Sequence, residues 1–147
     1  MAVPGYEAPH VRVLKLQHNQ FEGQLLDVTY FVTPNLEVLD LSHNKLVGVL
    51  PTLFCQNLTY LALANNYYSG PIPSELGALS RLEFLDLSGN SEVTGSIPCE
   101  LADLTSLTYL DLSGTSVTGE IPLELCQRSK NITILANCSQ AQCCEGF

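Results

Sequence analysis

The feature of this chain that most constrains its fold is an internal repeat. Similar segments begin about 22 to 25 residues apart, at Val11, Leu36, Leu58, Leu82, Leu107 and Ile132. Most of them follow the pattern L-x-x-L-x-L-x-x-N, as in the run from Leu36 to Asn44. A repeat of this length predicts a solenoid, in which each repeat is one turn of a coil and stacks on its neighbours.

The middle of each repeat predicts a short β-strand, because apolar and other residues alternate there. Equivalent strands one repeat apart must be parallel, since the intervening residues carry the chain once around the coil. The repeated leucines then fill one continuous core. We expect a mostly β fold of the α/β class, with about five full repeats and a sixth, terminal strand at residues 132–135.

Asparagines recur where each predicted strand ends, at Asn19, Asn44, Asn66 and Asn90. The backbone turns inward there, and an Asn side chain can satisfy several buried backbone groups at once. We expect these residues to form a structural ladder. Repeat five has Thr115 at this position, which predicts a loosening near the C-terminal end.

Composition and charge exclude several functions. The chain has 147 residues, of which 14% are charged, and a net charge of −9. Its six cations are scattered, so we expect no nucleic-acid partner. No stretch approaches the roughly 20 apolar residues of a spanning helix, so we expect no membrane segment in this chain. Glycine-rich phosphate loops are absent, and we expect no cofactor and no metal.

A second motif follows the asparagine in several repeats: Gly70-Pro71-Ile72-Pro73, Gly95-Ser96-Ile97-Pro98 and Gly119-Glu120-Ile121-Pro122. With this motif the chain resembles the plant-specific leucine-rich repeat of receptor-kinase ectodomains, receptor-like proteins and polygalacturonase inhibitors. The resemblance covers residues 11 to about 137. It implies a leucine-rich repeat solenoid, a curved right-handed coil with a parallel sheet on its concave face and a second extended segment at each Gly-x-Ile-Pro.

The resemblance divides the chain into three parts. Residues 1–10 lack the family's usual cysteine-containing N-terminal cap, residues 11–131 form five repeats, and residues 132–147 form a sixth strand and a C-terminal cap. A solenoid without its cap exposes its end leucines. A fragment, a truncated gene model and an unusual cap all remain open.

The six cysteines suit an oxidising compartment. Cys55 and Cys126 lie three repeats apart, about 14 Å, which is too far for a disulfide. We expect Cys126 to pair with Cys138, Cys143 or Cys144, with Cys99 as the second candidate. A zinc site from Cys126 and the tail cysteines is the disfavoured alternative, because the tail lacks a usual zinc spacing.

Three N-x-[ST] sequons, at Asn57, Asn131 and Asn137, are glycosylation candidates. The first two fall at the same repeat position, so ordinary repeat chemistry explains them equally well. Together with the cysteines and the resemblance they favour an extracellular or cell-surface location, although no signal peptide is visible.

Two columns of outward-facing strand residues are candidates for binding. The first reads Val13, Val38, Tyr60, Phe84, Tyr109 and Ile134, and the second Lys15, Asp40, Ala62, Asp86, Asp111 and Ala136. The apolar first column either stabilises neighbouring strands or binds a partner. In the second, Asp86 and Asp111 have the spacing of glycosidase carboxylates, but Leu-Asp-Leu-Ser is ordinary repeat sequence, so we expect no catalysis. His18 and His43 also stack, and we expect a solvated surface pair there.

We therefore expect a non-enzymatic binding module that resembles part of a receptor-like ectodomain and takes a protein, peptide or glycan ligand on its concave face. The contacts are expected from Val38, Asp40, Tyr60, Phe84, Asp86, Tyr109 and Asp111. The alternative is an inhibitor of a cell-wall-degrading hydrolase, similar to the polygalacturonase inhibitors.

Overall fold

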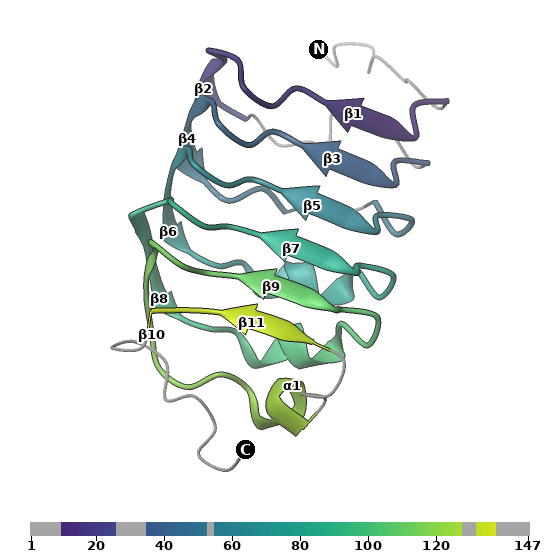
Figure 1. The fold of residues 1–147 in the computed structure, drawn as a ribbon, viewed down its shortest axis with the longest axis vertical. Helices are drawn as coiled ribbons and strands as arrows, with labels where there is room; N and C mark the ends of the chain where they lie inside the picture. Colours follow the sequence, from purple (N-terminus) through teal and green to yellow (C-terminus); the bar gives the residue numbers. More distant parts are fainter. Residues whose placement is uncertain (1–9, 26–34, 53–54, 128–131, 138–147) are drawn as a thin grey trace, which may run out of the picture.

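The computed structural model describes residues 10–25, 35–52, 55–127 and 132–137. Its strands form two parallel sheets (Figure 1). The first sheet contains β1 (Val13–Lys15), β3 (Val38–Asp40), β5 (Tyr60–Ala62), β7 (Phe84–Asp86), β9 (Tyr109–Asp111) and β11 (Thr133–Leu135). The second contains β2 (Glu22–Gln24), β4 (Lys45–Val49), β6 (Tyr67–Pro71), β8 (Glu92–Ser96) and β10 (Ser116–Thr118).

Each strand pairs with its equivalent one repeat away, so the order in both sheets follows the order of the repeats. Within the described residues, three short helices close the coil after the repeat prolines: η2 (Ser74–Ala78), η3 (Cys99–Asp103) and α1 (Leu123–Gln127). This arrangement confirms the predicted solenoid with a parallel sheet. We call the solvent-facing side of the first sheet the concave face.

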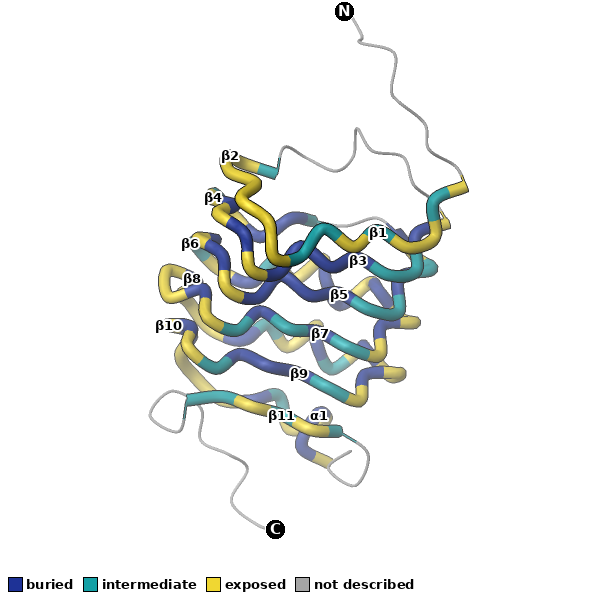
Figure 2. The backbone as a smooth tube through the Cα atoms, turned by 45° about the horizontal axis from the view of Figure 1, so that its top comes forward, coloured by how far each residue is buried: buried dark blue, intermediate teal, exposed yellow. Residues whose placement is uncertain are grey.

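The core lies between the two sheets. It consists of leucines that stack on the equivalent leucines of the neighbouring repeats. Leu61, Leu85 and Leu110, at the centres of β5, β7 and β9, are all 0% exposed. Figure 2 shows that buried stretches recur in successive coils of the chain. Because each leucine packs against the coils on both sides, burial couples every repeat to its neighbours.

The asparagine ladder ties successive coils together. Asn66 is buried, and its Nδ2 donates to the carbonyls of Leu41, Leu63 and Ala64, while its Oδ1 accepts from the Leu46 N–H. Asn44 and Asn90 have equivalent bonds one repeat away. Asn19 differs, because it is exposed and bonds only within its own repeat among the described residues.

The ladder changes at Thr115. Its hydroxyl donates to the carbonyl of Leu112 at 2.6 Å. The N–H of Val93 donates to the backbone carbonyl of Asn90 at 3.0 Å, whereas the equivalent N–H in the previous repeat, of Tyr68, donates to the Asn90 side chain. The side chain at this position therefore differs in its bonding from the ladder asparagines, and the expected loosening there stays a prediction.

The register of β11 differs from the one expected for the two columns of outward-facing strand residues. Thr133 pairs with Tyr109, Ile134 with Leu110 and Leu135 with Asp111. The expectation that Ile134 and Ala136 end the columns is wrong, because both pack partly buried against the core. A shift by one residue exchanges the two faces of a strand, and the observed register turns apolar side chains inward rather than Thr133.

The structure separates the cysteine candidates. Cys126 is disulfide-bonded and buried in α1. Cys99 is an exposed free thiol whose Sγ lies 3.6 Å from Glu100 Oε2 at the start of η3, so the Cys99 pairing is wrong. It points to solvent, whereas Cys126 faces the core. Cys138, Cys143 and Cys144 lie outside the described residues.

Candidate functional site

Three aromatic rings stack along the concave face. The ring centroids of Tyr60 and Phe84 lie 4.3 Å apart with an interplanar angle of 6°, and those of Phe84 and Tyr109 lie 4.5 Å apart at 2°. The parallel register places the three residues side by side on β5, β7 and β9. All three are half-buried, so their ring edges remain open to a partner.

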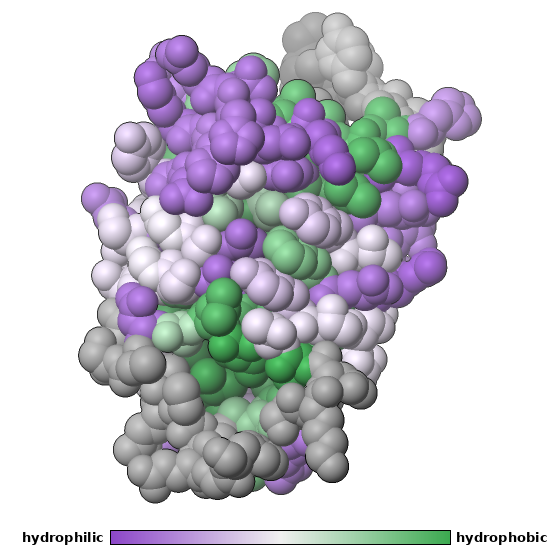
Figure 3. Space-filling view, in the orientation of Figure 1, coloured by the Kyte–Doolittle hydropathy of each residue, from purple (hydrophilic) through white to green (hydrophobic). Residues whose placement is uncertain are grey.

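Val38 and Val13 continue this column toward β1, and Thr133 ends it on β11. Figure 3 views this side of the molecule, which is mainly hydrophilic over its upper part and has hydrophobic residues gathered around β11. The aromatic stack therefore lies in the middle of a mixed surface, with the apolar Leu135, 42% exposed, near one end.

Asp40, Asp86 and Asp111 form the second column with Ala62 between the first two. Each carboxylate uses Oδ1 to accept from the backbone N–H two residues later, of Ser42, Ser88 and Ser113. These bonds hold the turn that ends each strand, which gives the Leu-Asp-Leu-Ser sequence a local structural reason.

The neighbouring carboxylates of Asp86 and Asp111 both take part in hydrogen bonds within their own repeats. Asp111 Oδ2 accepts from the Tyr109 hydroxyl at 3.2 Å, so both of its oxygens are engaged. The Asp86 side chain fixes its own turn. These are structural roles, and catalysis needs a pocket and a free reacting group as well.

The tyrosine hydroxyls beside these carboxylates stay protonated at neutral pH. Burial raises the pKa of Tyr60, and the negative charges of Asp40 and Asp86 raise it further. Burial also raises the pKa of Tyr109, followed by the charge of Asp111 and the hydrogen bond to it. Both phenols are therefore hydrogen-bond donors on a negatively charged surface.

Sequence models of the leucine-rich repeat match residues 9–67 and 34–91, and a related model matches residues 81–104 and 106–127. The chain belongs to the leucine-rich repeat family. Its Gly-x-Ile-Pro segments, which lie at the second sheet, are those of the plant-type repeat, and the similar proteins below come from plants.

The receptor-like protein kinase BRI1-like 3 of Arabidopsis thaliana is 68% identical over 37 residues, which are 24% of this chain and 3% of that protein. The plant peptide hormone receptor RGFR1, solved in complex with RGF2, has a TM-score of 0.79 at 32% identity, over 87% of this chain and 20% of that one. The Arabidopsis receptor kinase HAESA, solved with the peptide hormone IDA and the co-receptor SERK1, has a TM-score of 0.77 at 34% identity, over 87% of this chain and 22% of that one. This leucine-rich repeat chain thus spans a small part of these receptors.

The stacked histidines occupy a special backbone position of the leucine-rich repeat. The rings of His18 and His43 lie 4.2 Å apart, and both residues have positive φ, of 57° and 55°. The same position is Asn65, Gly89 and Gly114 in later repeats, all with positive φ. Sequence reasoning missed this constraint, although the run of His, Asn and Gly is typical of left-handed backbone.

Metal binding and membrane insertion are the other possibilities for this chain. In the described part of the chain, no three His, Cys, Asp or Glu side chains are placed to hold a metal ion. Nor does this part contain a helix long and apolar enough to cross a membrane.

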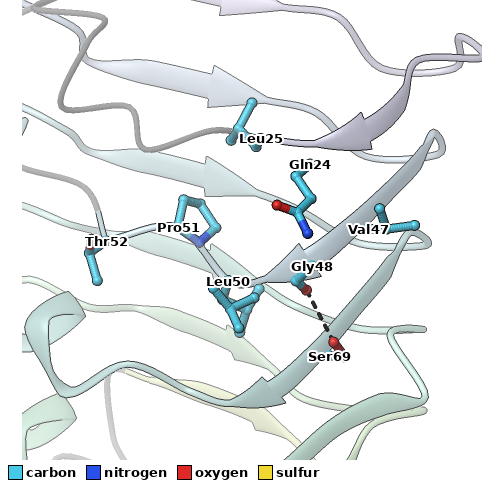
Figure 4. Close-up of a pocket in the computed structure, with 9 residues that line it drawn as sticks. Gln24, Leu25, Val47, Gly48, Leu50, Pro51, Thr52 and Ser69 are labelled. Carbon is cyan, nitrogen blue, oxygen red and sulfur yellow. Dashed lines mark hydrogen bonds between the residues drawn. The ribbon is translucent and has the colours of Figure 1, made fainter.

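A pocket of about 510 Å³ lies at the second sheet, away from the concave face (Figure 4). Ser69 donates to the Gly48 carbonyl at 3.4 Å on one side of it. Its described lining residues are uncharged: Gln24, Leu25, Val47, Gly48, Val49, Leu50, Pro51, Thr52 and Ser69.

The sequons differ in their surroundings. Asn57 is half-buried, and its Oδ1 accepts from Arg81 Nη1 at 3.1 Å. Asn137 accepts from the Gly114 N–H and donates to the Thr115 carbonyl, both at 3.3 Å. Asn131 lies outside the described residues. Both described sequon asparagines are therefore half-buried and hydrogen-bonded, and their use as glycosylation sites stays a prediction.

Proposed function

We propose that this chain is a non-enzymatic binding module of a receptor-like ectodomain, and that its concave face binds an extended peptide or protein segment. The observation that carries the proposal is the stack of Tyr60, Phe84 and Tyr109 with open ring edges on a regular sheet. Half-buried aromatic side chains supply much of the affinity of protein interfaces.

Two further observations support a peptide ligand. RGFR1 and HAESA, whose structures resemble this one, were each solved with a peptide. The aspartate and tyrosine side chains beside the stack offer acceptors and donors at a regular spacing along the sheet, which suits a chain with repeating polar groups. No feature of this face favours the hydrolase-inhibitor alternative over a peptide ligand.

A displayed library of linear random peptides tests the proposal. Selection on the wild-type chain should enrich peptides whose binding is lost in the variants Tyr60→Ala, Phe84→Ala and Tyr109→Ala. Tyr67→Ala is the matched control, because Tyr67 is 62% exposed on the second sheet. Circular dichroism of each variant checks that the fold survives.

Enriched peptides that bind the three concave variants as tightly as the wild type, with the fold intact, would overturn the proposal. Selection that enriches no specific peptide at all would count against it equally.

The proposed location outside the cell or at its surface has its own test. Intact mass spectrometry of the protein from its natural source should show a disulfide mass shift on reduction and a glycan at Asn57. An unmodified chain with all cysteines reduced would contradict this location.

A further inference from the structure

Tyr60 and Tyr109 hold equivalent positions on the concave face but have different surroundings. The Tyr109 hydroxyl donates to Asp111 Oδ2, two residues along the same strand. At the same place on β5, Tyr60 has Ala62, whose methyl side chain cannot accept a hydrogen bond. In the described part of the chain the Tyr60 hydroxyl has no hydrogen bond, although it lies close enough to Asp40 and Asp86 to feel both charges.

Asp40 and Asp86 flank Ala62 on the neighbouring strands β3 and β7. Their backbones are two strand spacings apart, roughly 9.6 Å. The bonds that the described residues give these two carboxylates all go to Oδ1, from Ser42 and Ser88, so neither Oδ2 has a hydrogen bond within the described residues. Asp40 is 8% exposed and Asp86 is half-buried, so Asp86 is the more open side of this place. The sheet register thus places three oxygen-bearing side chains, from three adjacent strands, next to Ala62.

The nearest cation in the same column does not fill this place. Lys15 pairs with Asp40 in the sheet register, on the side away from Ala62. The described residues form one ion pair, between Arg12 and Glu37, so Lys15 does not neutralise Asp40 by contact. The chain as a whole carries a net charge of −9, which adds to the negative potential here.

We propose that Asp40, the Tyr60 hydroxyl and Asp86 form a clamp for one positively charged side chain, arginine or lysine, of the peptide bound at the concave face. This inference rests on the proposed function, because it names a residue class within the same ligand. The aromatic stack beside the clamp provides an apolar surface for the methylene stem of such a side chain.

The separation of the carboxylates decides between an organic cation and a metal ion. Calcium ligands lie about 2.3–2.6 Å from the ion, and side chains about 9.6 Å apart at the backbone need large movements to share one. A guanidinium spans a wider gap than a single ion, because its separate N–H groups can bond the two carboxylates at about 2.8 Å each.

Two synthetic peptides test the clamp by NMR: acetyl-Gly-Gly-Arg-Gly-Gly-amide and the same peptide with neutral citrulline in place of arginine. The arginine peptide should shift the Ala62 methyl and Tyr60 ring signals, with about five- to tenfold tighter binding than the citrulline peptide. Asp86→Asn should remove about that difference. It keeps the amide oxygen that the Ser88 N–H needs, so the turn survives.

Asp111→Asn is the matched control, because it makes the same change of charge one strand away at a carboxylate already bonded to Tyr109. It should change the affinity for the arginine peptide by less than about twofold. Equal effects of Asp86→Asn and Asp111→Asn, or equal binding of the two peptides, would overturn the clamp.

The library selection separates the two proposals. One outcome is that the selected peptides bind the concave face of both the wild type and Asp86→Asn without a preference for arginine or lysine. This result would overturn the clamp and leave the proposed function standing. An arginine preference in the NMR experiment without any library peptide on this face would remove the proposed function instead.

Discussion

Asn66 Nδ2 donates to the carbonyl of Leu41 at 3.0 Å, across the gap between two coils of the chain. This bond joins residues that are far apart in sequence but one repeat apart in space, and it lies in a buried place where water cannot replace it. The stability of the solenoid therefore depends on single side chains at regular intervals.

We expect Asn66→Ala to lower the free energy of unfolding by about 2–4 kcal/mol, because it leaves one buried N–H and up to three buried carbonyls with fewer partners. Urea denaturation followed by circular dichroism measures this. Asn19→Ala is the control and should change stability by less than about 0.5 kcal/mol, since Asn19 is exposed. Equal losses of unfolding free energy in the two variants would mean that burial of the ladder asparagine does not determine its contribution to stability.

Tyr68 has an unusual hydroxyl. The residue is 0% exposed, and its hydroxyl finds no hydrogen-bond partner in the described part of the chain. Other repeats have Leu46, Val93 and Val117 at this position. We expect Tyr68→Phe to raise the free energy of unfolding by about 1 kcal/mol, because it removes an unsatisfied buried group and keeps the ring.

Tyr67→Phe is the matched control for Tyr68→Phe, since Tyr67 is the exposed neighbour on the same strand. Urea denaturation of both variants should show a gain in Tyr68→Phe alone. A clear loss in Tyr68→Phe would show that the hydroxyl has a stabilising partner.

Stability should fall in alkaline solution. Burial raises the pKa of Tyr68 above its ordinary value, and the pKa values of Tyr60 and Tyr109 are raised as well. The unfolded chain then loses tyrosine protons first, so the stabilising contribution is complete below about pH 10 and is lost as the pH rises toward the folded-state values.

We expect each such tyrosine to lower the free energy of unfolding by at most about 1.4 kcal/mol per pH unit in this range. The slope should be smaller in Tyr68→Phe than in the wild type. Urea midpoints measured from pH 9 upward at about half-unit steps test this, and identical slopes in the two proteins would contradict it.

Gly77 is required by the contact between η2 and η3. A Cβ atom at this position would meet the backbone carbonyl oxygen of Glu100 far inside van der Waals distance. We expect Gly77→Ala to cost about 1–3 kcal/mol, because two packed helices must move apart. Ala102→Gly, at the equivalent position of the next repeat, should cost about 1 kcal/mol or less.

Thermal unfolding of the two variants distinguishes them. A Gly77→Ala protein as stable as the wild type would show that the helices separate at little cost.

The sequence predicts the solenoid well because its period fixes the pairing of strands, and with it the alignment of Tyr60, Phe84 and Tyr109. It fails at β11, where the repeat pattern alone aligns Ile134 with Tyr109 and only the burial of Ile134 shows the true register. The repeat period also cannot show which hydrogen bonds an outward-facing side chain makes. The hydrogen bond of Tyr109 to Asp111, and its absence at Tyr60 within the described residues, are visible only in the structure.

The close spacing of the aromatic rings limits how a ligand can approach. Centroids 4.3 and 4.5 Å apart are closer than the roughly 4.8 Å between neighbouring strands. A flat group cannot insert between these rings without moving the strands apart, which the buried leucines and asparagines oppose. A peptide bound at this face, as proposed above, would therefore lie across the ring edges, and its affinity would depend on how many of its residues contact the sheet rather than on insertion of a group between the rings.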